Sequence, residues 1–172
     1  DTCALNSHLR LGNALAQELF EGEIVPLFDS KGNVYAKDDG HRVDSDIEKL
    51  AQLRPIFDRP YGLVTAGNSS QVSDGAALVL LASERAVEFF DLPVLGRIVD
   101  SHWAALDPAQ MGLGPVHAMA PILQRNQLDS SDIDGWEINE AFAAQVLGCL
   151  AAWQQDDYMQ QEVGIEQPLS PI

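Results

Sequence analysis

An asparagine and a glutamate stand side by side at positions 139 and 140, in the stretch WEINEAFAAQ, where a short apolar run gives way to small, helix-forming residues. A joint between a strand and a helix exposes backbone N–H groups and the positive helix end, which favour polar or anionic partners. Asn139 could therefore hold a polar ligand. It could equally be a helix N-cap, with Glu140 complementing the helix dipole, and this interpretation needs no chemistry. Position alone favours the cap.

Other groups of reactive side chains do not make a complete site. GLGPVH (112–117) begins like a dinucleotide fingerprint, but His117 stands where the third glycine belongs. Glu137 and Glu140 fall on a predicted strand and a predicted helix, so they lack the shared helix face of a di-metal site. His102 and His117 have no neighbouring ligands at metal spacing and are expected to be structural. We predict no metal site.

The charge balance argues against two classes of partner. The 172 residues include 26 acidic and 10 basic side chains, giving a net charge of −16, and no Lys or Arg follows Arg125. Such a surface repels phosphate backbones and anionic lipid, so nucleic-acid and membrane-surface roles are not expected. No apolar run reaches the length of a membrane span. The basic residues between Lys37 and Arg59 could still meet a small anionic ligand.

The cysteines indicate a compartment. Cys3 and Cys149 have neither CxxC spacing nor the pattern of a disulfide framework, and neither has a histidine nearby in the sequence. Reduced thiols in the cytoplasm are the simpler expectation. The chain begins with Asp, and we expect it to be an interior piece of a longer protein.

Periodicity predicts alternating strands and helices. Apolar residues at helical spacing predict an amphipathic helix over 2–20, and the segment 35–59 is polar. Alternation of the elements predicts an α/β layered fold, with a boundary between Leu92 and Pro93. The other expected elements are an edge strand at 23–28, a short helix at 47–53, strands at 63–66, 93–103 and 135–138, and helices at 76–90, 111–127 and after 138.

Several stretches together resemble one family, the thiolases, which make or cleave 3-ketoacyl-CoA by acyl transfer. They are VTAGNSSQVSDGAALVLLASE (64–84), MGLGPVHAM (111–119) and DIDGWEINEAFAAQ (132–145), supported by LRPIFDRPYG (53–62) and CALNSHLRLGNA (3–14). The YGLVTAGNSSQ form looks most like the subgroup related to fatty-acid-oxidation ketoacyl-CoA thiolases. The resemblance implies part of a thiolase-like layered αβ fold. Residues 1–92 would end the N-terminal half, including part of its loop domain, and 93–172 would start the C-terminal half.

The family's reacting groups are missing from this sequence. Thiolases attack acyl-CoA with the cysteine of a Cys-x-Ser motif, helped by the histidine of a Gly-His-Pro motif and by a second cysteine, and none of these motifs occurs here. The resemblance thus implies a segment of an acyltransferase that is inactive alone. A non-catalytic CoA-binding or assembly module, a pseudoenzyme or relic, is the alternative. A ketoacyl synthase relative is a third, which Asn-Glu-Ala-Phe disfavours.

The resemblance gives the opening asparagine a role. In thiolases the asparagine of Asn-Glu-Ala-Phe positions a water that stabilises the negative oxygen developing on the thioester or enolate, and Asn139 matches it. A preorganised donor of this kind contributes roughly 3 to 4 kcal/mol of transition-state stabilisation. Ala141 and Phe142, with Glu140, would shape the floor of the acyl and pantetheine tunnel.

Further matches concern coenzyme A, which the resemblance implies as a substrate, with no cofactor. Ala66 and Ser70 match the loop that contacts the pantetheine arm, Met111 a tunnel methionine, and Phe57 an aromatic near the pantetheine. Arg42 matches a basic residue near the nucleotide, where a guanidinium can pair with phosphate oxygens. The structural alternatives are a loop bond for Ser70, core packing for Met111 and simple solvation for Arg42. The resemblance also implies a homodimer or homotetramer for the complete protein.

Overall fold

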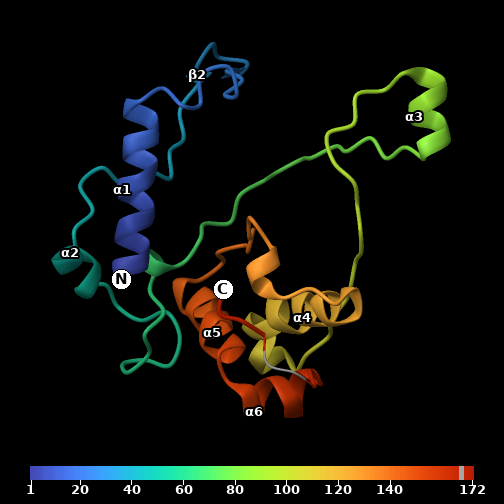
Figure 1. The fold of residues 1–172 in the computed structure, drawn as a ribbon. Helices are drawn as coiled ribbons and strands as arrows, with labels where there is room; N and C mark the ends of the chain where they lie inside the picture. Colours follow the sequence, from blue (N-terminus) through green and yellow to red (C-terminus); the bar gives the residue numbers. More distant parts are fainter. Residues whose placement is uncertain (167–168) are drawn as a thin grey trace. The chain divides into compact units, whose positions relative to one another are not determined.

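The computed structural model describes residues 1–166 and 169–172 and divides into two units (Figure 1). The first unit contains Asp1–Gln71 and Asn139–Leu147, and the second contains Val72–Ile138 and Gly148–Ile172. Helix α5 (Ala143–Trp153) begins in the first unit and ends in the second.

Helix α1 (Thr2–Ala16) opens the first unit and confirms the predicted N-terminal helix, although it ends earlier than residue 20. Glu18 follows the helix with a φ of 57°, in the left-handed region that stops a right-handed helix from continuing. At the other end of the helix, the Asp1 carboxylate accepts a hydrogen bond of 3.2 Å from the Asn68 amide. This bond ties the start of α1 to the segment around Asn68.

A short hairpin follows α1. Strands β1 (Leu27–Phe28) and β2 (Val34–Tyr35) pair antiparallel, so only the end of the predicted edge strand at 23–28 is a strand. The Asp29 carboxylate accepts from the backbone N–H groups of Lys31 at 2.8 Å and Asn33 at 2.9 Å, which closes the turn. A hydrogen bond of 2.7 Å from the Asn33 side-chain amide, together with these backbone bonds, holds the Asp29 pKa below its ordinary value.

Two short helices follow the hairpin in the first unit. Helix α2 (Ile47–Ala51) starts at Asp46, whose carboxylate caps the Lys49 N–H at 2.7 Å, and it confirms the predicted helix near residue 47. The 3₁₀ helix η1 (Ala66–Asn68) lies where a strand at 63–66 was predicted. That prediction was wrong, because Thr65 forms only an isolated bridge with Pro55 and then caps η1.

The core lies in the second unit. Helix α4 (Gly114–Asn126), preceded by the 3₁₀ helix η2 (Pro108–Leu113), confirms the helix predicted at 111–127 and packs against the end of α5. Trp153 is 2% exposed and donates its indole N–H to the Ser170 carbonyl oxygen at 2.9 Å. Smaller elements of this unit are η3 (Ser130–Asp132), α6 (Asp156–Tyr158) and the π-helical turn η4 (Met159–Val163). The buried residues are Val116, Ala120, Leu123, Cys149, Ala152, Trp153, Met159 and Ile165.

Three other predictions for this part of the chain were wrong. Of the helix predicted at 76–90, only α3 (Glu84–Phe90) forms, and the strands predicted at 93–103 and 135–138 are absent from the described residues. A strand exists only through ladder hydrogen bonds to a neighbour, and among the described residues these segments have none. The two strand-helix units expected on either side of Leu92 and Pro93 are therefore not formed. Leu78 and Leu95 stay 97% and 102% exposed.

Candidate functional site

The segment after η1 is hydrogen-bonded to the Asn-Glu-Ala-Phe segment. The Ser70 N–H donates to the Ala141 carbonyl oxygen at 2.8 Å, and Ser69 and Phe142 form an antiparallel bridge. Both segments belong to the first unit. Three of the predicted site residues, Ser70, Ala141 and Phe142, therefore lie side by side although they are far apart in the sequence.

The turn before Ser70 is held rigidly by its own side chains. Thr65 accepts from Gly67 N–H at 3.2 Å, and the Asn68 side chain accepts from Thr65 N–H at 2.9 Å, forming a capping box. A Cβ on Gly67 would lie 2.5 Å from a Leu53 methyl carbon, so a larger residue here would require the Leu53 side chain to move. Ala66, at the start of the turn, is exposed. Such a turn holds Ala66 and Ser70 at fixed, exposed positions.

Phe57 lies in a loop that closes onto the same turn. The Ile56 N–H donates to Val64 O at 2.8 Å, and Pro55 forms an isolated bridge with Thr65. Phe57 itself is 59% exposed. The loop therefore holds the accessible Phe57 ring next to Ile56, which is hydrogen-bonded to Val64 just before the turn.

Asn139 is exposed and makes no hydrogen bond through its side chain to any described residue. Helix α5 begins at Ala143, and the Phe142 carbonyl oxygen accepts from the Gln145 and Val146 N–H groups. The cap interpretation of Asn139 was therefore wrong, because the helix starts too late for Asn139 to cap it. Its amide can donate to and accept from water.

The remaining predicted residues lie elsewhere. Arg42 belongs to the first unit, in an exposed loop before α2, and its N–H donates to His8 Nδ1 at 3.3 Å. Met111 belongs to the second unit and is 62% exposed in η2, so it is not a core residue. The next carbonyl oxygen, that of Gly112, accepts from the Cys149 thiol at 3.1 Å.

Both histidines expected to be structural have partners. His117 Nε2 lies 2.8 Å from the Tyr158 hydroxyl, and the rings meet edge to face. Burial raises the pKa of Tyr158, so its hydroxyl stays protonated and can donate to His117. His102 Nδ1 lies 3.4 Å from the Arg125 guanidinium. In the described part of the chain, no group of three or more His, Cys, Asp or Glu side chains could hold a metal ion.

Sequence reasoning did not single out His8 or His41. His41 Nε2 lies 3.1 Å from the His8 carbonyl oxygen, and Arg42 is bonded to the His8 ring. No spacing in the sequence signals this arrangement, because it depends on where the loop meets α1.

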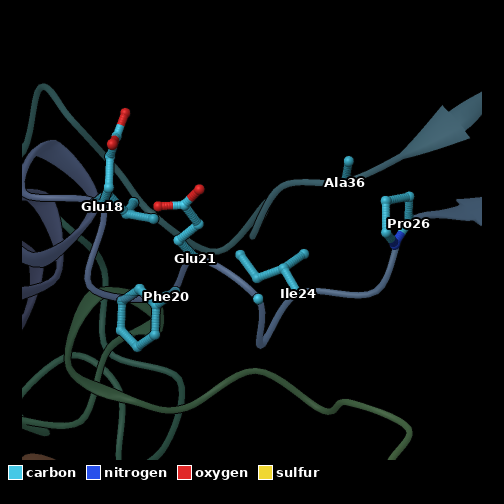
Figure 2. A pocket seen from close by; sticks show the side chains of 8 residues that line it. Glu18, Phe20, Glu21, Ile24, Pro26 and Ala36 are labelled. Carbon is cyan, nitrogen blue, oxygen red and sulfur yellow. The ribbon is translucent and has the colours of Figure 1, made fainter.

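A hollow of about 350 Å³ lies beyond the C-terminal end of α1, away from these residues. Figure 2 shows Glu18, Phe20 and Glu21 toward one end of it and Pro26 and Ala36 toward the other, with Ile24 between them. None of the described residues that line it belongs to the predicted site. Its two carboxylates would also repel an anionic ligand such as a phosphate.

Comparison with known families identifies the chain. Residues 1–85 match the thiolase N-terminal domain, and residues 92–165 match the thiolase C-terminal domain. The chain belongs to the thiolase family.

Similar proteins include 3-ketoacyl-CoA thiolases. The peroxisomal enzyme of Saccharomyces cerevisiae is 43% identical over 150 residues, covering 87% of this chain and 36% of that protein. The enzyme of Aliivibrio fischeri is 38% identical over 169 residues, covering 96% of this chain and 44% of that protein. This chain thus spans less than half the length of these relatives. The peroxisomal names do not support the cytoplasmic compartment that the cysteines predicted.

Solved structures confirm the expected fold class, part of a thiolase-like αβ fold. The dimeric peroxisomal thiolase of Saccharomyces cerevisiae has a TM-score of 0.77 and 43% identity over 86% of this chain and 38% of that chain. The Bacillus anthracis acetyl-CoA acetyltransferase has a TM-score of 0.78 and 38% identity over 96% of this chain and 44% of that chain. No described helix is both long enough and apolar enough to cross a membrane.

Proposed function

We propose that this chain is the segment of a thiolase-type acyltransferase that binds coenzyme A and holds the oxyanion water. The reaction moves an acyl group between the CoA thiol and an enzyme cysteine, so that a 3-ketoacyl-CoA and free CoA give acetyl-CoA and a shortened acyl-CoA. Residues 1–92 belong to the N-terminal half of the subunit and residues 93–172 to the C-terminal half. CoA is a substrate in this reaction, and no cofactor is needed.

The hydrogen bond between Ser70 and Ala141 is the observation that carries the proposal. It joins the turn that presents Ala66 and Ser70 to the segment that carries Asn139, so a pantetheine arm lying along the turn reaches the Asn-Glu-Ala-Phe residues. The Ser70 hydroxyl suits a pantetheine amide, as donor or acceptor.

Asn139 holds the water that stabilises the developing negative oxygen. Its side-chain amide is exposed and has no hydrogen-bond partner among the described residues, so it is available to hold a water. An amide N–H directed at that water leaves the water's own proton for the developing negative oxygen. Phe142 and Ala141 supply the apolar floor, Phe57 contacts the pantetheine, and Arg42 pairs with the nucleotide phosphates. Met111 keeps its proposed role as a tunnel residue on the family motif alone.

Two properties of the complete protein belong to the same proposal. We infer a homo-oligomer, supported by the dimeric relative from Saccharomyces cerevisiae. The compartment is the cytoplasm or the peroxisome. The cysteine pattern favours the cytoplasm, whereas the names of several relatives favour the peroxisome.

The alternative is a non-catalytic CoA-binding or assembly module. The Cys-x-Ser and Gly-His-Pro motifs are both missing from the 172 residues. The coding sequence on either side separates the two functions: an upstream Cys-x-Ser and a downstream Gly-His-Pro in frame support the acyltransferase, and stop codons support the module.

An assay of the longer gene product completes the test. Cleavage of acetoacetyl-CoA with free CoA, lost when the upstream cysteine becomes alanine, is the expected result. An intact set of motifs with no turnover on acetoacetyl-CoA or on longer 3-ketoacyl-CoA substrates would exclude the acyltransferase.

A further inference from the structure

The loop that carries Arg42 is fastened to helix α1 through two histidines. Arg42 N–H donates to His8 Nδ1 at 3.3 Å, and His41 Nε2 lies 3.1 Å from the carbonyl oxygen of the same His8. The two imidazole rings are 6.1 Å apart. His8 therefore contacts two consecutive residues of the loop: its ring bonds to Arg42, and its carbonyl oxygen contacts His41.

Helix α1 is shaped to allow this contact. A Cβ on Gly12 would lie 3.1 Å from His41 Nε2, which is closer than most Cβ contacts. Glycine at this position lets the His41 ring approach the helix, and a Cβ there would require the ring to shift by a few tenths of an ångström.

These contacts determine where the protons of the two rings lie. Because the Arg42 N–H is a donor, His8 Nδ1 must be the unprotonated nitrogen, and a neutral His8 then carries its proton on Nε2. The His8 carbonyl oxygen can only accept, so His41 Nε2 must carry a proton. A neutral His8 ring is therefore an integral part of the contact.

The contact fixes the backbone of Arg42 and leaves its side chain available. The Arg42 carbonyl oxygen accepts from Ser45 N–H at 3.2 Å, so both backbone polar groups of Arg42 are bonded. Its guanidinium forms no ion pair with any described carboxylate, whereas Lys49 and Arg125 do. In a chain of net charge −16, this leaves an exposed cation for an anionic ligand.

We propose that His8 is a positioning residue for Arg42, and that this bond places the guanidinium to meet the nucleotide phosphates of coenzyme A. The inference rests on the proposed function. A guanidinium on a fixed backbone loses less freedom on binding than one on a mobile loop, so the bond improves affinity for the nucleotide without touching it.

The test compares two ligands and five variants of the 172-residue chain, four single substitutions and the double variant His8→Ala/Arg42→Ala. Coenzyme A carries the nucleotide, and pantetheine lacks it. His8→Ala removes the acceptor, and His8→Asn keeps one, because the asparagine Oδ1 stands as many bonds from Cβ as the histidine Nδ1. Arg42→Ala removes the cation, and Asn6→Ala changes an exposed residue of α1 as the control. Titration calorimetry gives each dissociation constant.

The expected results form one pattern. His8→Ala weakens CoA binding about fivefold, the net effect of one hydrogen bond, and leaves pantetheine binding unchanged. His8→Asn restores most of the CoA affinity, and Asn6→Ala behaves as wild type. Arg42→Ala weakens CoA binding about tenfold or more, and adding His8→Ala to it has no further effect. The Arg42 amide also exchanges its hydrogen faster in His8→Ala than in Asn6→Ala.

Other results would overturn the inference, and they distinguish a failure of the His8 role from a failure of the proposed function. If Arg42→Ala weakens CoA binding and His8→Ala does not, His8 has no positioning role and the proposed function stands. Equal losses for CoA and pantetheine in His8→Ala would make its role purely structural. Wild-type CoA affinity in Arg42→Ala would remove Arg42 from the nucleotide site. If the chain binds neither ligand, both this inference and CoA binding by the chain are wrong.

Discussion

Ser70 and Ala141 are joined by a main-chain hydrogen bond of 2.8 Å that connects the turn after η1 to the Asn-Glu-Ala-Phe segment. A main-chain bond of this kind does not depend on either side chain. Substitutions at Asn139, two residues before Ala141, can therefore change the chemistry of the site while the junction stays in place.

In the complete enzyme, we expect Asn139→Asp to cut turnover about a hundredfold or more, on the scale of losing one oxyanion donor. An ionised aspartate only accepts hydrogen bonds and places negative charge beside the developing oxyanion. Because Asn139 is exposed and does not cap α5, the change in unfolding free energy should stay within about 0.5 kcal/mol. Steady-state kinetics and thermal melting measure the two effects.

Glu137→Gln is the matched control, since it also changes one charge near the site but leaves the Asn139 amide intact. It should retain turnover. If the Asn139→Asp variant is as fast as wild type, at equal stability, Asn139 is an ordinary loop residue.

The 172-residue chain alone should not cleave acetoacetyl-CoA with free CoA, because the Cys-x-Ser and Gly-His-Pro motifs are absent from its sequence. The rate with purified chain should equal the rate in buffer. If turnover occurs, Cys3→Ala and Cys149→Ala decide its source. Loss of activity in either variant would identify a nucleophile, and activity that survives both would place the chemistry on other residues.

The ion pair between Asp100 and Arg125 predicts a pH-dependent stability. Arg125 Nε and Nη2 each donate to the Asp100 carboxylate at 2.6 Å, and this pair, helped by Asn126, holds the Asp100 pKa far below its ordinary value. A carboxyl whose pKa is lower in the folded chain stabilises the fold above its unfolded pKa of about 4. The stabilisation is lost as the pH falls from there through the folded value.

Asp100→Asn should therefore have a lower urea midpoint than wild type at pH 7. The difference between the two midpoints, called the gap below, should become smaller as the pH falls from about 4. Asp39→Asn, at an exposed carboxylate with no hydrogen bond among the described residues, is the control and should show little gap at any pH. A gap for Asp100→Asn that stays constant from pH 7 to about pH 3 would mean that the ionised carboxylate is not what stabilises the fold.

Two tryptophans in the second unit should respond differently to substitution. Trp153 is 2% exposed, meets Trp136 edge to face at 5.8 Å, and bonds to Ser170 O, so Trp153→Ala should lower the unfolding free energy by about 3–5 kcal/mol. Trp103 is 91% exposed, so Trp103→Ala should change it by less than about 0.5 kcal/mol. Urea unfolding followed by circular dichroism measures both. Similar losses in the two variants would contradict the location of the core.

Three helices, α1, α2 and α4, were predicted well from the sequence. The positions of α1, α2 and α4 follow from apolar spacing and capping residues such as Asp46, because a helix forms its hydrogen bonds within its own segment. The family also followed from the sequence, since its motifs are short runs of neighbouring residues. The CoA-binding roles of Ser70, Met111 and Arg42 remain predictions that rest on those motifs.

Only the tertiary structure decided which distant segments meet. The strands predicted at 63–66 and 93–103 failed because a strand needs a partner from elsewhere in the chain, and apolar residues alone do not supply one. The cap alternative for Asn139 was wrong because local pattern does not fix where α5 starts. The bond between Ser70 and Ala141, and that between His8 and Arg42, join residues far apart in the sequence. Such contacts depend on the path of the backbone in space. The residue types at the contacting positions do not determine that path.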